Sequence, residues 1–137
     1  MVDNNNRKSS DKMFRIETTG IVRVNRGDTF QCPLFINKGT ELYPIRFRLK
    51  DEDKCYLGIM EPNQRFEDAI VKKVYTNKDE NENGDIVIKF NTEDTLYLLP
   101  GKYYYEIKLK YYDEKLKDYQ INTIIGRQQF FIEEEIG

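Results

Sequence analysis

The sequence contains no histidine and no tryptophan, and only two of its 137 residues are serines, Ser9 and Ser10. Without histidine, the chain cannot form a Ser-His or Cys-His catalytic pair or a histidine-ligated metal site. Tryptophan, the side chain most often used to stack on sugars, is also missing. These absences predict a protein that is not an enzyme and that carries no cofactor.

Alanine occurs once, at Ala69, whereas isoleucine occurs 14 times, tyrosine ten times and phenylalanine eight times. Alanine favours helices, and β-branched and aromatic residues favour strands. The composition therefore predicts an all-β domain. The hydrophobic fraction of 39% suffices for one modest core.

The charges are balanced: the net charge is −2, and basic and acidic residues are interspersed, which gives no reason to expect nucleic acid as a partner. No apolar run approaches the ~20 residues that span a bilayer, so no membrane partner is expected. The N-terminus lacks the apolar stretch of a signal peptide. We therefore expect synthesis in a reducing cytoplasm and free thiols at Cys32 and Cys55 rather than a disulfide.

The composition divides the chain into three regions. Residues 1–12 are polar and predict an arm that is disordered or ordered by a partner, residues 13–133 form the domain, and residues 134–137 form an acidic tail. Strands are expected at residues 13–18, 21–25, 29–36, 44–50, 55–60, 66–76, 85–90, 102–112 and 119–132. Residues 68–74 also fit a helical turn, and the strand is the preferred interpretation.

Alternation within these strands predicts which side chains face the core. The predicted core consists of Phe30, Leu34, Ile36, Ile45, Phe47, Leu49, Ile86, Ile88, Phe90, Tyr103, Tyr105, Ile107 and Leu109. Pro33 cannot donate to a ladder, so its strand should lie at an edge, be bulged, or leave that position unpaired. Gly126 predicts a bulge in the last strand.

Seven to nine short antiparallel strands joined by turns predict a β-sandwich, with a closed barrel as the alternative. Residues 93–97 fit a short helical turn capped by Asn91 or Thr92. Such a turn before a tyrosine-rich strand is typical of the crossover between the sheets of an immunoglobulin-like domain, where an early tyrosine bonds back to the crossover. Tyr103 or Tyr105 fills that place, so the predicted fold is an immunoglobulin-like β-sandwich.

An acidic segment before the strand at residues 85–90 fits the first positions of a calcium loop. Its weak candidate ligands are Asp79, Asn81, Asn83 and Asp85, which alternate along the chain. The twelfth position, where a bidentate glutamate is needed, is Phe90. A solvated hairpin turned by Asn83 and a glycine is therefore the favoured interpretation, and no metal is expected.

Outward positions of the strands supply candidate contact residues. Arg46, Arg48 and Lys50 alternate with apolar residues and indicate a solvated basic face. Phe35, Val87 and Tyr104 are apolar or aromatic residues at outward positions, and we expect them to anchor a protein partner.

Five motifs, in this order along the chain, carry a resemblance to a known family. They are Gly27-Asp28-Thr29-Phe30, Tyr56-Leu57-Gly58-Ile59-Met60-Glu61-Pro62-Asn63-Gln64, Asn83-Gly84-Asp85-Ile86, Asp94-Thr95, and Leu99-Pro100-Gly101-Lys102-Tyr103-Tyr104-Tyr105-Glu106. Over residues 13–132 the chain resembles small immunoglobulin-like structural proteins of phages and prophages of Gram-positive bacteria. It is similar, more loosely, to the amino-terminal domain of phage baseplate upper proteins.

The resemblance implies a non-catalytic structural module of a phage virion, made in the cytoplasm of the bacterial host. It implies an adaptor or decoration subunit of a tail, baseplate or capsid, in contact with other virion proteins in a multi-copy assembly. The alternative is a module that binds carbohydrate, such as a surface glycan, or another ligand.

Overall fold

The computed structural model describes residues 14–16, 20–39 and 42–134. The described strands are β1 (Phe14–Ile16), β2 (Val22–Asn25), β3 (Phe30–Leu34), β4 (Ile36–Gly39), β5 (Pro44–Arg46), β6 (Lys54–Met60), β7 (Val71–Tyr75), β8 (Ile86–Phe90), β9 (Gly101–Asp113) and β10 (Asp118–Glu133). The helix α2 spans Thr92–Leu96, and the 3-10 turns η2 and η3 span Phe66–Asp68 and Asn77–Asp79. The expected arm at residues 1–12 and most of the expected acidic tail lie outside the described residues.

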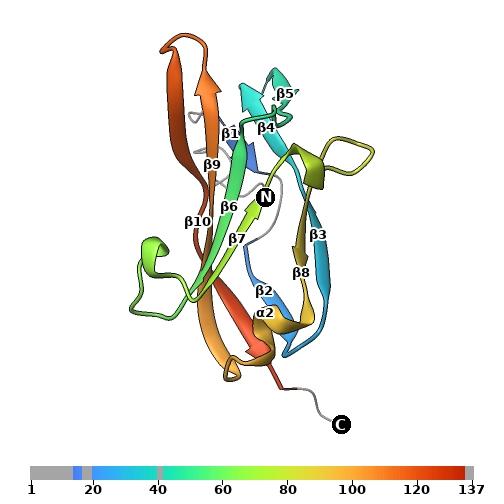
Figure 1. Cartoon of the computed structure of the whole chain (residues 1–137), viewed down its shortest axis with the longest axis vertical. Coiled ribbons are helices and arrows are strands. Elements are labelled where there is room, and N and C mark those ends of the chain that lie inside the picture. Colours follow the sequence, from blue (N-terminus) through green and yellow to red (C-terminus); the bar gives the residue numbers. More distant parts are fainter. Residues whose placement is uncertain (1–13, 17–19, 40–41, 135–137) are drawn as a thin grey trace.

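The strands are distributed over three sheets (Figure 1). A five-stranded sheet has the order β2-β10-β9-β6-β7, a three-stranded sheet has the order β1-β4-β5, and β3 pairs with β8. Neighbouring strands are antiparallel except β2 and β10, which are parallel. The described chain is therefore mostly β, with one α-helix, which confirms the predicted class.

The prediction that all strands are short and antiparallel is wrong in two respects. β9 and β10 have 13 and 16 residues, because they pair with each other along nearly their whole length. The parallel pair arises because the chain passes from β1, in the three-stranded sheet, to the edge of the five-stranded sheet. There β2 runs in the same direction as the last strand.

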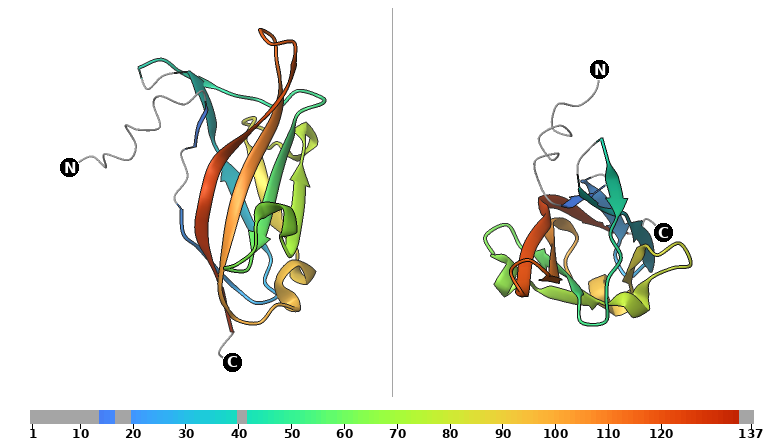
Figure 2. Two further views of the ribbon diagram at one scale, coloured as in Figure 1. Left: turned by 90° about the vertical axis from the view of Figure 1, so that its left-hand side faces the viewer. Right: turned by 90° about the horizontal axis from the view of Figure 1, so that it is seen from above.

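The sheets curl around one hydrophobic core (Figure 2). The five-stranded sheet contributes Phe130, and the opposite side contributes Phe90; the two rings stack with centroids 5.6 Å apart. Ten of the thirteen predicted core residues are buried, namely Leu34, Ile36, Leu49, Ile86, Ile88, Phe90, Tyr103, Tyr105, Ile107 and Leu109. Phe30 and Phe47 are partly buried against this core.

The prediction that Ile45 belongs to the core is wrong, because its exposed fraction is 63%. It lies on β5, a strand of three residues whose one partner among the described strands is β4. β5 is an edge strand of the three-stranded sheet, so alternation along it does not direct side chains into the core.

Two predicted strands are divided. The strand expected at residues 29–36 breaks at Phe35, because the chain changes partners: β3 pairs with β8, and β4 pairs with β1 and β5. The segment at residues 66–76 contains both alternatives that the sequence left open, a helical turn at η2 and a strand at β7. Pro33 lies opposite Val87 on β3, whose other edge carries no partner among the described strands, as expected for a proline.

The predicted helical turn is confirmed as α2, which lies between β8 and β9. The Asn91 amide donates to the carboxylate of Asp94 at 2.7 Å, so an acidic side chain closes the first turn. The Tyr103 hydroxyl donates to the Leu99 carbonyl at 2.7 Å, which is the predicted backward bond to the crossover. The predicted irregularity around Gly126 is also present, as register shifts on either side of it.

One side of the molecule is fastened by the side chain of Tyr75, which extends from β7 to β8. Its hydroxyl donates to the Lys89 carbonyl at 3.0 Å and accepts the Lys89 amide at 3.2 Å. These two backbone groups therefore point away from β3 and toward β7. A second contact on this side joins the Lys73 ammonium to Asp94 at 2.8 Å.

We expect Tyr75→Phe to lower the free energy of unfolding by about 1–2 kcal/mol, because it leaves both backbone groups of Lys89 without this partner. Urea unfolding measures the loss, and hydrogen exchange at the Lys89 amide should accelerate. Tyr119→Phe is the control, since that tyrosine is 38% exposed, and it should change stability by less than about 0.5 kcal/mol. Equal stability of the two variants would show that the hydroxyl of Tyr75 does not hold the strands together.

Candidate interaction surfaces

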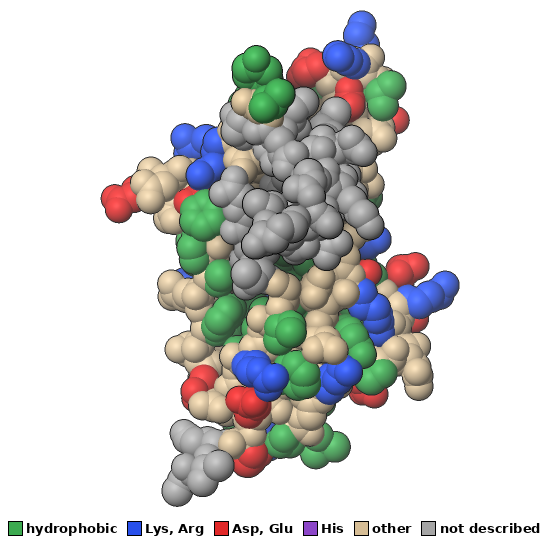
Figure 3. All heavy atoms as spheres, turned by 180° about the vertical axis from the view of Figure 1, so that it is seen from behind, with side chains coloured by type: hydrophobic (Ala, Val, Ile, Leu, Met, Phe, Trp, Pro, Cys, Tyr) green, Lys and Arg blue, Asp and Glu red, His purple; other side chains and the backbone are tan. Residues whose placement is uncertain are grey.

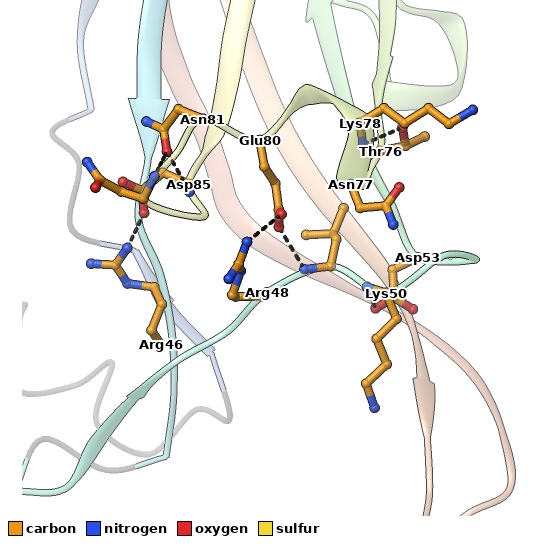
Figure 4. Close-up of polar contacts among 12 residues, drawn as sticks. Arg46, Arg48, Lys50, Asp53, Thr76, Asn77, Lys78, Glu80, Asn81 and Asp85 are labelled. Atoms are coloured by element: carbon orange, nitrogen blue, oxygen red, sulfur yellow. Dashed lines mark hydrogen bonds and ion pairs between the residues drawn. The ribbon is translucent and has the colours of Figure 1, made fainter.

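The acidic segment before β8 is bound by two arginines from the chain that follows β4 (Figure 4). The guanidinium of Arg46 contacts the carboxylate of Asp85, whose side chain is only 3% exposed. Arg48 contacts Glu80 at 3.2 Å, and the other oxygen of Glu80 accepts the Leu49 amide at 3.2 Å. The contacts fasten the segment at residues 46–49 to the loop before β8.

Three of the four candidate calcium ligands, Asp79, Asn81 and Asp85, use their side-chain oxygens within the protein. The Asp79 carboxylate accepts the Thr76 amide at 2.8 Å, which closes the first turn of η3. The Asn81 side-chain oxygen accepts the amides of Asn83 and Asp85 at 2.9 and 3.0 Å, so it shapes the turn. The structure thus favours the hairpin interpretation. Within the described ranges, no three acidic or thiol side chains gather as a metal site would require.

The basic face predicted from Arg46, Arg48 and Lys50 is not a free row of charges. Two of its members are ion-paired, as described above, although Arg46 remains 42% exposed and Arg48 62% exposed. Alternation correctly turned these side chains away from the core. It carried no information about the acidic loop, 32 to 39 residues away in the sequence, that meets them.

The three predicted anchor residues come from different elements of the fold. Val87 lies on β8, and Phe35 follows β3, where the guanidinium of Arg46 lies 5.2 Å from its ring centroid. Tyr104 lies on β9 in the five-stranded sheet, opposite Met60. Its neighbours Tyr103 and Tyr105 face the core, so Tyr104 faces the outer side of that sheet. The three residues therefore lie on separate elements, and their role as contacts for a partner stays a prediction.

The ring of Tyr104 is covered by its own chain. The guanidinium of Arg127 lies 4.6 Å from the ring centroid, and the Lys102 ammonium lies 5.6 Å away. Arg127 also donates to the carbonyls of Pro62 and Gln64 at 2.7 and 3.0 Å, so it holds the loop after β6 beside the ring. Tyr104 therefore packs against two cationic side chains of its own chain.

The hairpin formed by β9 and β10 extends beyond its neighbour β6 and carries apolar side chains. The pairing of β6 with β9 begins at Lys110, so residues 111–120 pair only across the hairpin itself. Leu116 in the turn is 63% exposed, and Ile121 is 60% exposed. Tyr112 and Tyr119 form an edge-to-face pair on the outer face with centroids 5.3 Å apart. We name the four residues Leu116, Ile121, Tyr112 and Tyr119 the hairpin patch.

A second group of exposed apolar residues lies at the same end of the molecule. Leu42, Tyr43 and Ile45, around the connection from β4 to β5, are 83%, 77% and 63% exposed. The β4–β5 connection and the tip of the long hairpin reach the same end in both side views (Figures 1 and 2). From behind, apolar side chains are visible at this end (Figure 3). Sequence alternation missed both groups, although Leu116 stands out as an apolar residue between charged ones.

The described helices include none that is both long and apolar enough to cross a membrane. The cysteines are both free: Cys55 is fully buried, and Cys32 is partly buried. Burial raises the pKa of the Cys55 thiol to about 12. Cys55 is therefore protonated and unreactive at neutral pH.

Comparisons of the chain with protein-family models, with curated proteins and with solved structures found no match.

Proposed function

We propose that the chain folds as an immunoglobulin-like β-sandwich. Three features support this assignment. The five-stranded sheet faces the pair β3–β8 across the core, and the first part of the chain is divided between sheets, with β1 beside β4 and β2 beside β10. The helical crossover α2 precedes β9, and Tyr103 bonds back to it as a tyrosine corner does.

We propose that this domain is a non-catalytic structural subunit of a phage virion and acts through protein–protein contacts in a multi-copy assembly. The hairpin patch is the observation that supports a role in protein–protein contacts. A two-stranded hairpin is at best marginally stable in water on its own. Here its outer face exposes aromatic and aliphatic side chains, which are characteristic of interface cores. The virion setting rests on the order of sequence motifs described above.

The hairpin patch is suited to docking for a second reason. The Lys110 ammonium lies 5.1 Å from the ring centroid of Tyr119, so a charged side chain borders the apolar patch. Leu42 and Tyr43 form a second exposed apolar group at this end of the molecule, separate from the hairpin tip in Figures 1 and 2. A partner that covers both groups would bury the large exposed apolar side chains at this end of the molecule.

The test replaces two exposed residues of the hairpin patch, Leu116→Ser and Ile121→Ser, in a host whose induced phage carries the gene. Neither side chain is buried, so the thermal midpoint should change little. Mass spectrometry should detect the wild-type chain in purified particles. The amount of the double variant in particles should be at least tenfold lower. The gene should also lie among genes for tail or capsid proteins.

Val74→Ser is the matched control, since Val74 is a 52% exposed apolar residue on β7, away from the hairpin patch. It should be incorporated into particles as the wild type is. Absence of the wild-type chain from particles would contradict the virion role. Unchanged incorporation of the folded double variant would contradict the role of the hairpin patch.

A further inference from the structure

A cavity of about 250 Å³ lies in the core between β2 and β3. Its inner wall is formed by Phe30, Leu57, Ile88, Phe90, Ile107 and Phe130. Its rim includes Ile21 and Pro33, which are exposed, so the cavity reaches the surface on this side. It therefore joins the core of the molecule to solvent.

The cavity opens on the side of the molecule where β2 and β3 lie in different sheets. On the opposite side, Tyr75 bonds to Lys89, and Lys73 pairs with Asp94. On the cavity side, β2 pairs only with β10 and β3 pairs only with β8, so no ladder joins β2 to β3 within the described residues. The left-hand view of Figure 2 places β2 and β7 on opposite sides of the molecule. The opening thus follows from how the sheets are connected.

The walls specify an apolar ligand. Phe90 stacks on Phe130, and Phe30 meets Phe90 edge-to-face with centroids 5.9 Å apart, so aromatic surfaces surround the space. The polar group of Tyr105 is engaged, since its hydroxyl donates to the Gly20 carbonyl at 2.5 Å. Burial raises the pKa of Tyr105 to about 12, so this hydroxyl stays neutral at physiological pH. Arg23 also lines the cavity, but its guanidinium pairs with Glu133 at 3.1 Å and lies 4.2 Å from the ring centroid of Phe131, so its charge is engaged within the protein.

We propose that this cavity is a binding site for one small apolar molecule, with one or two rings or a short aliphatic chain. A cavity of roughly 150 Å³ lined by Leu, Ile and Phe is large enough to hold benzene and stays dry when empty. A volume of about 250 Å³ accommodates a somewhat larger hydrocarbon. Because the cavity is open to solvent, binding removes apolar wall surface from water and adds contacts to the aromatic rings.

Cys32 provides a direct reporter of occupancy. It lines the cavity and is partly buried, whereas Cys55 is fully buried elsewhere in the core. Iodoacetamide should therefore modify Cys32 in the folded protein and Cys55 only after unfolding. A ligand in the cavity covers Cys32 and should slow its modification.

The experiment titrates the full chain with indole, used as the probe. We expect saturable 1:1 binding by calorimetry, and at ten times the Kd a thermal midpoint about 4 °C higher. Indole at saturation should slow alkylation of Cys32 at least fivefold, measured by intact mass. Absence of saturable binding, or an unchanged alkylation rate, would overturn the proposal.

Two substitutions at one position separate cavity binding from adsorption to the surface. Cys32→Phe places a ring in the cavity and should weaken indole binding at least tenfold, whereas Cys32→Ala leaves the cavity open and should bind as the wild type does. Circular dichroism checks that both variants are folded. Wild-type affinity in folded Cys32→Phe would place the indole elsewhere and overturn the proposal. None of these outcomes depends on the virion role.

Discussion

Phe130→Ala should lower the free energy of unfolding by about 4 kcal/mol. The Phe130 ring is 2% exposed, stacks on Phe90 and meets Tyr105 edge-to-face with centroids 6.1 Å apart. It also lines the cavity between β2 and β3, so its removal enlarges an existing space. The walls belong to strands on both sides of the core, which limits collapse around the vacated volume. The loss should therefore lie in the upper part of the usual range for a buried phenylalanine.

The next residue along the chain is the control. Phe131 is partly exposed on the opposite face of β10, where the guanidinium of Arg23 lies 4.2 Å from its ring centroid. Phe131→Ala should cost about 1 kcal/mol, through a partly buried ring and one cation–π contact. Urea unfolding of both variants gives the comparison. Similar losses would mean that the two faces of β10 are equally buried, contrary to the structure.

Arg46→Met should lower the free energy of unfolding by about 2–3 kcal/mol at neutral pH. Arg46 faces Asp85, whose carboxylate is 3% exposed and loses its counter-charge in the variant. Methionine keeps much of the length of the side chain, so the effect reports the charge more than the packing. The figure lies below that for a fully buried pair, because Arg46 is 42% exposed and the loop at residues 80–85 is at the surface.

Replacing the other partner of the ion pair tests which unpaired charge costs more stability. Asp85→Asn leaves Arg46 with access to water, so it should cost less than Arg46→Met, about 1 kcal/mol. Arg48→Met is the matched control, since Arg48 is 62% exposed and contacts Glu80 across the same pair of segments. It should cost less than about 1 kcal/mol. Equal losses for the two arginine variants would show that burial of the Asp85 carboxylate does not set the cost.

Local patterns along β9 predicted much of the fold. Alternation along this strand correctly buried Tyr103 and Tyr105 and turned Tyr104 outward, and the pattern continues to the buried Tyr111 and the exposed Tyr112. It succeeded because a strand that pairs on both sides and covers the core repeats its environment every two residues. The same rule failed for Ile45, because the short edge strand β5 does not cover the core.

The loop after β6 shows a further limit. Met60 lies at an outward position of its strand, opposite Tyr104, yet it is fully buried. A side chain at Gly58, two residues earlier, would approach Phe66 and Ala69 to 3.0 and 3.1 Å, so this part of the outer face is covered by the loop. Periodicity predicts which face of a sheet a residue lies on, but it does not predict whether another segment covers that face.

The sequence by itself determined the β class, most of the core and the crossover before β9. These features depend on residue type and on neighbours a few positions apart, such as the Asn91–Asp94 contact that begins α2. Only the tertiary structure decided that β2 and β10 run in parallel, that Arg46 meets Asp85 and that the cavity opens beside β3. Each of these joins segments far apart in the chain, and their meeting depends on how the sheets curl around the core.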